Sequence, residues 1–307
     1  MNPAIRTFLR SLGAEISPQM LQGTQRFFAE RFVGIDPATS ITRDHPYGPH
    51  ERHRLDIFTT AGRKDAPVLV FVHGGGFVMG DKRAPGGLPF YDNLGDFAAS
   101  AGFVGVTMTY RLAPAHPWPA GTEDVAAAVR WVRENIATYG GDPRRIFLMG
   151  QSAGAVHVAG YVAHSRFHVA EGGGIAGALM ISGSYDVAQA DANPFHLAYY
   201  GEARDAWPAC STLDGLAASP LPLFFSVSEL DGADFQRQAA LLVTAFARAR
   251  GTYPRMHWLE GHNHLSPVLA IGSAADTLGP LVRSFVASTG AEVARTPSEE
   301  AHSASSR

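Results

Sequence analysis

The pentapeptide Gly150-Gln151-Ser152-Ala153-Gly154 has the G-x-S-x-G spacing in which a serine can act as a nucleophile. The spacing alone is a modest signal, because a chain with 33 glycines can contain it by chance. Its surroundings strengthen it, since residues 146–149 are strand-like and residues 153–164 favour a helix. A sharp turn between strand and helix strains the backbone of Ser152, and the flanking glycines remove side chains that would clash there. We therefore predict Ser152 as the nucleophile of covalent catalysis.

A glycine-rich loop, His73-Gly74-Gly75-Gly76-Phe77, directly follows the apolar segment 68–72. A serine that attacks an acyl group creates an oxyanion, and consecutive glycines let backbone N–H groups approach that oxyanion closely. The predicted oxyanion donors are the amides of Gly75, Gly76 and Ala153, with Gly74 as a further candidate. A phosphate-binding loop is the competing interpretation, but no Gly-Lys-Ser/Thr follows these glycines.

The serine needs a base, and the base needs an acid that orients it. Three carboxylates follow the apolar segment 223–227, and the chain order serine, acid, histidine makes them candidates for the acid. Asp231 is favoured because it lies in the turn just past the strand. Glu229, near the strand end, and Asp234, as a helix cap, stay open as alternatives.

Two histidines, His262 and His264, follow the segment 255–259 and compete for the role of base. His264 is favoured because it lies deeper in the loop. The His-x-His spacing also occurs in metal sites, but no third ligand has a recognisable spacing. We therefore predict no metal and no organic cofactor.

Strand-like and helix-like segments alternate along the chain that must position these groups. Residues 55–58 are predicted to form an edge strand. Further strands are expected at 68–72, 103–110, 146–149, 178–182, 223–227 and 255–259, and helices at 122–139, 153–164, 235–248 and 274–286. This alternation predicts an α/β fold, with a mostly parallel central sheet and helices on both faces.

Three segments lie outside the alternation, and they set the domain boundaries. Residues 1–48 are predicted to be a helical N-terminal cap that precedes the first strand, and residues 49–290 the catalytic domain. Residues 187–216 are a candidate cap insertion, and the small, polar residues 291–307 a disordered tail. Candidate substrate-binding residues are Phe77, Tyr199 and Tyr200.

The composition excludes several classes of protein. The net charge of −3 gives no basic surface, so nucleic acid and anionic membranes are not expected partners. The single cysteine, Cys210, rules out an internal disulfide. Residues 1–18 lack the long apolar stretch of a signal peptide, so we expect a cytoplasmic protein.

The chain resembles the hormone-sensitive lipase family of carboxylesterases, the bacterial family IV esterases. The glycine loop at 73–77, the stretch Tyr110-Arg111-Leu112-Ala113-Pro114-Ala115-His116-Pro117-Trp118-Pro119-Ala120 and the serine motif carry this resemblance in the right order. The resemblance implies an α/β-hydrolase fold with a helical cap and the triad Ser152, Asp231 and His264. The chain departs from the family at Gln151, where an acidic residue is usual, and at Asp231-Gly232-Ala233-Asp234.

The function expected from these features is hydrolysis of a small-molecule carboxylic ester, with a small or short acyl group, through an acyl-enzyme. An arylformamidase or amidase is the alternative enzyme, because Asn263 before His264 resembles those hydrolases. A non-catalytic binding protein is the alternative from another class, but such proteins usually lose a triad member. A homodimer stays open.

Overall fold

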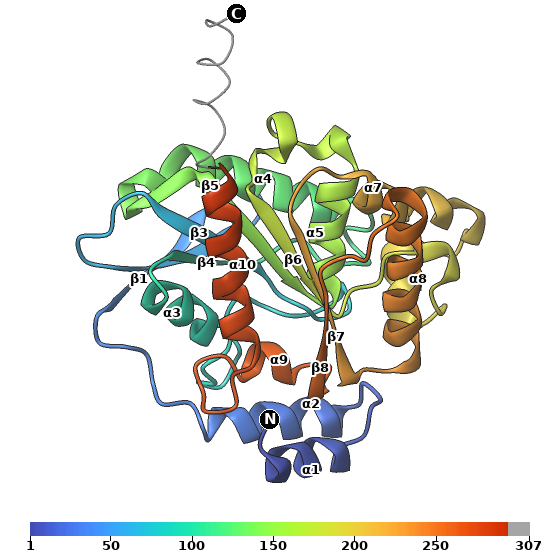
Figure 1. Cartoon of the computed structure of the whole chain (residues 1–307), viewed down its shortest axis with the longest axis horizontal. Coiled ribbons are helices and arrows are strands. Elements are labelled where there is room, and N and C mark those ends of the chain that lie inside the picture. Colours follow the sequence, from blue (N-terminus) through green and yellow to red (C-terminus); the bar gives the residue numbers. More distant parts are fainter. Residues whose placement is uncertain (294–307) are drawn as a thin grey trace, which may run out of the picture.

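A central sheet of eight strands runs through residues 1–293, which are the residues that the computed structural model describes (Figure 1). The strand order is β1-β2-β4-β3-β5-β6-β7-β8. Strand β2 is antiparallel to both β1 and β4, whereas every pair from β4 to β8 is parallel. The predicted α/β class with a mostly parallel sheet is therefore confirmed. The predicted tail begins within the last helix, and its residues 294–307 lie outside the described part.

The strands are β1 (Thr39–Pro46), β2 (Arg54–Thr60), β3 (Ala66–Val72), β4 (Val104–Met108), β5 (Gly141–Gln151), β6 (Gly177–Ile181), β7 (Leu223–Leu230) and β8 (Met256–Asn263). The α-helices are α1 (Pro3–Ser11), α2 (Pro18–Ala29), α3 (Asp92–Ser100), α4 (Ala120–Asn135), α5 (Ala153–Ala163), α6 (Pro194–Tyr200), α7 (Leu213–Ala218), α8 (Ala233–Arg250), α9 (Ser266–Leu269) and α10 (Leu278–Val293). Short 3-10 helices are η1 (Ile136–Tyr139), η2 (Ser165–Phe167), η3 (Glu171–Gly174), η4 (Val187–Gln189) and η5 (Arg204–Cys210).

Helices cover both faces of the sheet because the inner strands are apolar on both sides. In β3, Val68 and Val70 point into a core shared with α4, α5 and α8. The alternate residues Leu69 and Phe71 point into a second core shared with α3, α9 and α10. Side chains of a strand alternate between its two faces, so a continuously apolar strand requires cover on both.

Two expectations about the edge of the sheet were wrong. Residues 1–48 are not wholly helical, because β1 lies in this segment and pairs with β2. Strand β1 alternates between half-buried and exposed residues and has few apolar side chains, so hydrophobic patterning gave no signal. Strand β2 is flanked by β1 and β4 and is not an edge strand. Its Asp56 suggested an exposed face, but this carboxylate is buried against Arg43 and Lys82.

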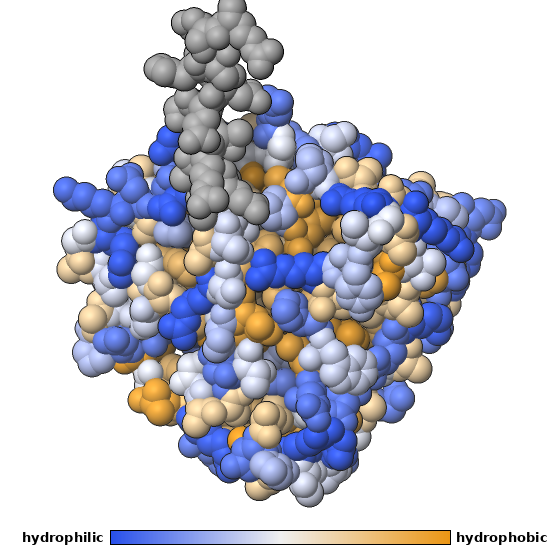
Figure 2. Space-filling model, viewed as in Figure 1, coloured by the Kyte–Doolittle hydropathy of each residue, from blue (hydrophilic) through white to orange (hydrophobic). Residues whose placement is uncertain are grey.

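The opposite edge of the sheet is β8, where Trp258 is 56% exposed. Figure 2 shows apolar residues at the surface between α8 and α10, on the side of the molecule where β7 and β8 run. Within residues 1–293, no helix combines the length and the apolar composition needed to cross a membrane.

Helices α1 and α2 lie together beside the ends of β7 and β8 (Figure 1). The segment 187–216, between β6 and β7, contains η4, α6, η5 and part of α7. It forms a small core of its own around Trp207 and Cys210. Both of these segments therefore pack against the rest of the fold. The carboxyl ends of the parallel strands β5, β7 and β8 all lie on the same side of the sheet.

Candidate active site

Ser152 lies in a sharp turn between β5 and α5. Its backbone has φ 54° and ψ −121°, a strained conformation for a residue with a side chain. The amide of Ser152 donates to the carbonyl of Ile181 (2.9 Å), which anchors the turn to β6. A Cβ on Gly154 would collide with the carbonyl oxygens of Val72, at the end of β3, and of the next residue, His73, so only glycine fits there. The turn therefore has the geometry expected of a nucleophile elbow.

Ser152, His264 and Asp231 form one chain of hydrogen bonds. Nε2 of His264 lies 2.8 Å from Oγ of Ser152, and Nδ1 of His264 lies 2.6 Å from Oδ1 of Asp231. An ionised carboxylate only accepts hydrogen bonds, so Nδ1 carries a proton and Nε2 is free to accept the serine proton. The structure thus brings together the three residues that sequence reasoning favoured.

Asp231 is held in place by its other oxygen. Oδ2 accepts hydrogen bonds from the hydroxyl of Ser182 (2.7 Å) and from the amide of Ser228 (2.7 Å). Sequence reasoning missed Ser182, although a polar residue directly after an apolar strand could have signalled it. Because both carboxylate oxygens are engaged, the orientation of Asp231 toward His264 is fixed.

The two alternative carboxylates have other partners. Glu229 accepts from Arg6, Arg10 and the amide of Gly261, and the hydrogen bond from Arg10 lowers the pKa of Glu229 to about 2. Asp234 accepts from Arg237 and from the amide of Asp191. Neither carboxylate is bonded to His264.

The second histidine, His262, is completely buried and bonded to two hydroxyls. Its Nδ1 lies 2.9 Å from Oγ of Ser266, and its Nε2 lies 2.7 Å from Oγ1 of Thr277. Burial lowers the pKa of His262 to about 4, so the ring is neutral at pH 7. His262 therefore has a structural environment, separate from that of Ser152.

The glycine loop lies beside Ser152 in an unusual backbone conformation. Gly75 and Gly76 have φ of 129° and 58°, and a Cβ on Gly75 would meet the carbonyl oxygen of Met79. The amides of Gly75, Gly76 and Ala153 donate to no group within residues 1–293. Three free donors next to a serine are what a developing oxyanion needs.

The carbonyl groups of this loop are tied down by other side chains. Nδ1 of His73 lies 2.7 Å from the oxygen of Gly74, and the hydroxyl of Tyr110 donates to the carbonyl of His73. This contact holds the carbonyl of Gly74 and leaves its amide, the further candidate donor, uninvolved. Burial lowers the pKa of His73 to about 4.

The proline-rich stretch 110–120 supports the site through Arg111. Its amide and its guanidinium both donate to Asp124, whose carboxylate is buried and also contacts His53. Burial raises the pKa of Asp124, but the hydrogen bonds from His53 and Arg111 more than offset it, and the pKa is lowered overall. Arg111 therefore ties the start of this stretch to α4.

The candidate substrate residues form an aromatic cluster beside Ala153. The rings of Phe77 and Tyr199 are stacked at 4.3 Å, and both side chains are almost fully buried. Tyr200 packs against them at the edge of the cluster. These rings fill space next to the nucleophile and offer it little free surface.

Two aromatic side chains that sequence reasoning did not select contact the ring of His264 or the glycine loop. Phe195 on α6 is 39% exposed, and a Cβ on Gly76 would lie only 2.9 Å from its ring. Phe235 on α8 packs on the ring of His264, with the centroids 4.3 Å apart. No local pattern could have signalled either, since both reach the site by tertiary packing.

The N-terminal helices contact the strand ends that carry the acid and the base. Arg6 bonds both Glu229, at the end of β7, and Glu260 in β8. The hydroxyl of Thr24 accepts from the side chain of Asn263, the residue before His264. Helices α1 and α2 therefore pack against the start of the loop that contains His264.

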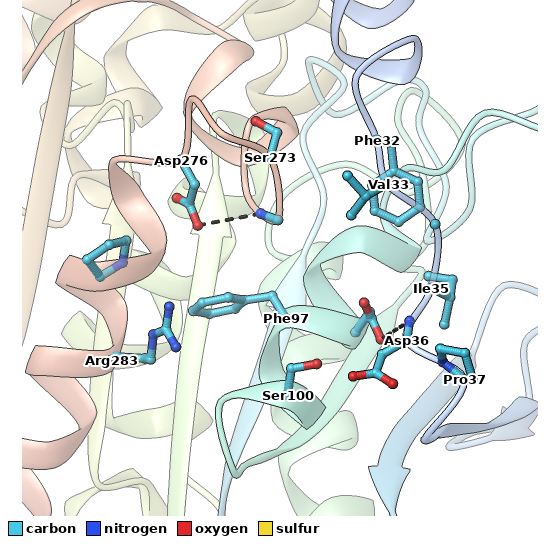
Figure 3. A pocket seen from close by; sticks show the side chains of 14 residues that line it. Phe32, Val33, Ile35, Asp36, Pro37, Phe97, Ser100, Ser273, Asp276 and Arg283 are labelled. Atoms are coloured by element: carbon cyan, nitrogen blue, oxygen red, sulfur yellow. Dashed lines mark hydrogen bonds between the residues drawn. The ribbon is translucent and has the colours of Figure 1, made fainter.

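An open groove among the described residues lies elsewhere (Figure 3). It has a volume of about 680 Å³ and lies between the α2–β1 connection, α3 and the turn before α10. Its carboxylates are bonded to backbone amides, Asp276 to Gly272 and Asp96 to Asp36, as the dashed lines in Figure 3 mark. No histidine lines it, so the groove lacks the groups for acyl transfer.

The chain is similar to known proteins of the α/β-hydrolase fold. A model of the α/β-hydrolase fold family matches residues 69–218. Carboxylesterase NlhH of Mycobacterium tuberculosis is 42% identical over 126 residues, which are 41% of this chain and 34% of that protein. Esterase LipQ of the same organism is 43% identical over 129 residues, 40% of this chain and 29% of that protein. The chain thus spans about a third of the length of these curated relatives.

Solved structures share the fold over almost the whole chain. An esterase from the bacterial hormone-sensitive lipase family has a TM-score of 0.68 at 20% identity, covering 94% of this chain and 97% of that one. Esterase B from Lactobacillus rhamnosis has a TM-score of 0.71 at 17% identity, covering 94% and 96%. This chain therefore has the α/β-hydrolase fold and resembles the carboxylesterases of the bacterial hormone-sensitive lipase family.

Proposed function

We propose that the protein hydrolyses carboxylic esters through an acyl-enzyme on Ser152. The observation that carries the proposal is the unbroken chain from Oγ of Ser152 through His264 to Asp231, with contacts of 2.8 Å and 2.6 Å. These distances lie within hydrogen-bond reach for proton transfer.

The reaction has two halves. In the first, Oγ of Ser152 attacks the ester carbonyl while its proton moves to Nε2 of His264. The amides of Gly75, Gly76 and Ala153 donate to the resulting oxyanion. The C–O bond to the alcohol then breaks, and the alcohol leaves with the proton from His264.

In the second half, water gives a proton to His264 and attacks the acyl-enzyme. The tetrahedral intermediate collapses, the acid product leaves, and the proton returns to Ser152. Asp231 keeps Nδ1 protonated throughout and stabilises the charged ring.

We infer a small ester with a short acyl chain as the substrate. Phe77 and Tyr199 already fill the space beside Ala153, so a long chain would have to displace packed rings. Hydrolysis of nitrophenyl esters of increasing chain length tests this inference. We expect the highest kcat/KM at two to four carbons, and a maximum at long chains would contradict it.

A fluorophosphonate probe tests the nucleophile. We expect stoichiometric labelling of Ser152 and none in Ser152→Ala, whose kcat should fall by about five orders of magnitude. Esterase B, a fold neighbour, is described with a tributyrin phosphonate, and this makes a second suitable probe.

An aryl formamide assayed beside the ester separates esterase from amidase activity. A folded wild-type protein that is neither labelled nor active would refute the proposal.

A further inference from the structure

We propose that Gln151 is a positioning residue that holds the main chain of His264 in register with Ser152. The inference rests on the proposed esterase function and adds a residue outside the triad and the oxyanion hole. Gln151 is the last residue of β5 and the direct neighbour of the nucleophile.

The contact is a single buried hydrogen bond. Nε2 of Gln151 donates to the carbonyl oxygen of His264 at 2.9 Å, and Gln151 is only 2% exposed. A carbonyl oxygen can only accept, so the amide nitrogen must face it, which fixes the orientation of the side chain.

The other end of the side chain lies against the glycine loop. A Cβ on Gly74 would collide with Oε1 of Gln151. Gln151 therefore fills the space between the loop of the base and the loop of the oxyanion donors. Loss of its amide would leave a buried carbonyl without this partner, which costs free energy unless the loop moves.

The His264 ring and the His264 backbone are thus held separately. Asp231 and Ser152 hold the ring, whereas Gln151 holds the carbonyl. Because Gln151 and Ser152 are consecutive, one side chain links the backbone of the nucleophile to that of the base. A displacement of about 1 Å in such a pair can lower a rate about 100-fold.

The hydrogen bond to the carbonyl of His264 requires a donor at position 151, which an ionised acidic side chain does not have. An ionised acid at position 151, as is usual in the family that the sequence resembles, would set a carboxylate against the carbonyl oxygen of His264. That oxygen needs a hydrogen-bond donor, which the amide of Gln151 supplies. A protonated glutamic acid could replace the amide, because its O–H also donates.

The test compares Gln151→Met, which has no donor, with Gln151→Glu, whose donor depends on pH. For Gln151→Met we expect kcat on a short nitrophenyl ester to fall 10- to 100-fold while KM stays within twofold. For Gln151→Glu, burial raises the pKa of the new carboxyl. Its kcat/KM relative to wild type should therefore be highest at low pH and fall as the carboxyl ionises. Loss of packing alone would not make the ratio of variant to wild-type kcat/KM depend on pH.

Gln238 supplies the matched control. It is completely buried, and its Nε2 donates to the carbonyl of Asp186 (3.0 Å), away from the triad. Gln238→Glu loses the same kind of donor, so we expect reduced thermal stability with kcat within twofold of wild type. Thermal unfolding of each variant ensures that rates are compared for folded protein.

Each outcome decides the proposal. If both Gln151 variants keep kcat within twofold, or if the Gln238 variant loses as much activity, Gln151 has no positioning role. An active wild type whose Gln151 variants keep kcat within twofold overturns this inference alone. A wild type without esterase activity or probe labelling overturns the proposed function and this inference together.

Discussion

His262 and His264 are separated by one residue, yet their side chains have different partners. Strand β8 ends at Asn263, and the chain turns there before α9. The side chain of Asn263 accepts from the amides of Leu265 and Ser266 and so stabilises the turn. His264 then faces Ser152, whereas His262 stays bonded to Ser266 and Thr277.

Substitution of each histidine should separate the two roles. For His264→Ala, we expect kcat to fall by about five orders of magnitude, because Ser152 loses its base. For His262→Ala, kcat should stay within tenfold, and the free energy of unfolding should fall by about 1–3 kcal/mol, because the hydroxyls of Ser266 and Thr277 each lose a hydrogen-bond partner. Ester kinetics and urea unfolding measure both effects. Inactivity of a folded His262→Ala protein would reverse the assignment.

At the scale of elements, the site depends on how closely α5 approaches β3. The sharp turn at Ser152 requires the first residues of α5 to pass directly over the end of β3. The neighbouring strands β4 and β5 hold β3 in the middle of the sheet, so its backbone cannot move away. The nucleophile elbow is therefore a property of strand, turn and helix together.

Gly154→Ala tests this close approach. The added Cβ would meet backbone carbonyl oxygens of β3, so we expect a loss of more than 3 kcal/mol of stability or no folded protein. Gly62→Ala is the control, because Gly62 has open space around it; it also carries the strain of a positive φ (74°), which Gly154 does not have. Its substitution should cost about 1–2 kcal/mol. Equal unfolding midpoints for the two variants would contradict the role of the contact.

At the scale of the whole molecule, several ionisable side chains are buried in their neutral form. Burial lowers the pKa of His73 and His262 to about 4 and that of His157 to about 3, from 6.5. The unfolded chain takes up protons near pH 6.5, but these folded rings do so only near pH 4 or below. Their contribution to stability is therefore full above pH 6.5 and is lost as the pH falls toward 4.

We therefore expect the urea midpoint to fall between pH 7 and pH 5, before most carboxylates titrate. One pKa unit corresponds to about 1.4 kcal/mol, so the three rings together should cost several kcal/mol at pH 5. His157→Phe removes one of the rings and keeps an aromatic shape between Phe77 and Tyr110. This variant should lose less stability between the two pH values than the wild type. A wild-type midpoint that stays constant would contradict the expectation.

The sequence by itself determined the class of the fold and most of the candidate site. Continuous apolar runs predicted the inner strands, because burial on both faces leaves no polar alternation. The serine motif and the glycine loop are local, and their turns depend on residues next to each other. Asp231 and His264 could be favoured because parallel strands deliver their carboxyl ends to the same edge.

Only the tertiary structure decided which groups touch. Strand β1 escaped prediction because backbone pairing with β2, and not apolar side chains, holds it in the sheet. The choice of His264 over His262, the support of Asp231 by Ser182 and the contact of Gln151 with His264 all join residues far apart in the chain. Hydrogen bonds of this kind depend on distance and direction in space, and a linear pattern of residue types contains neither.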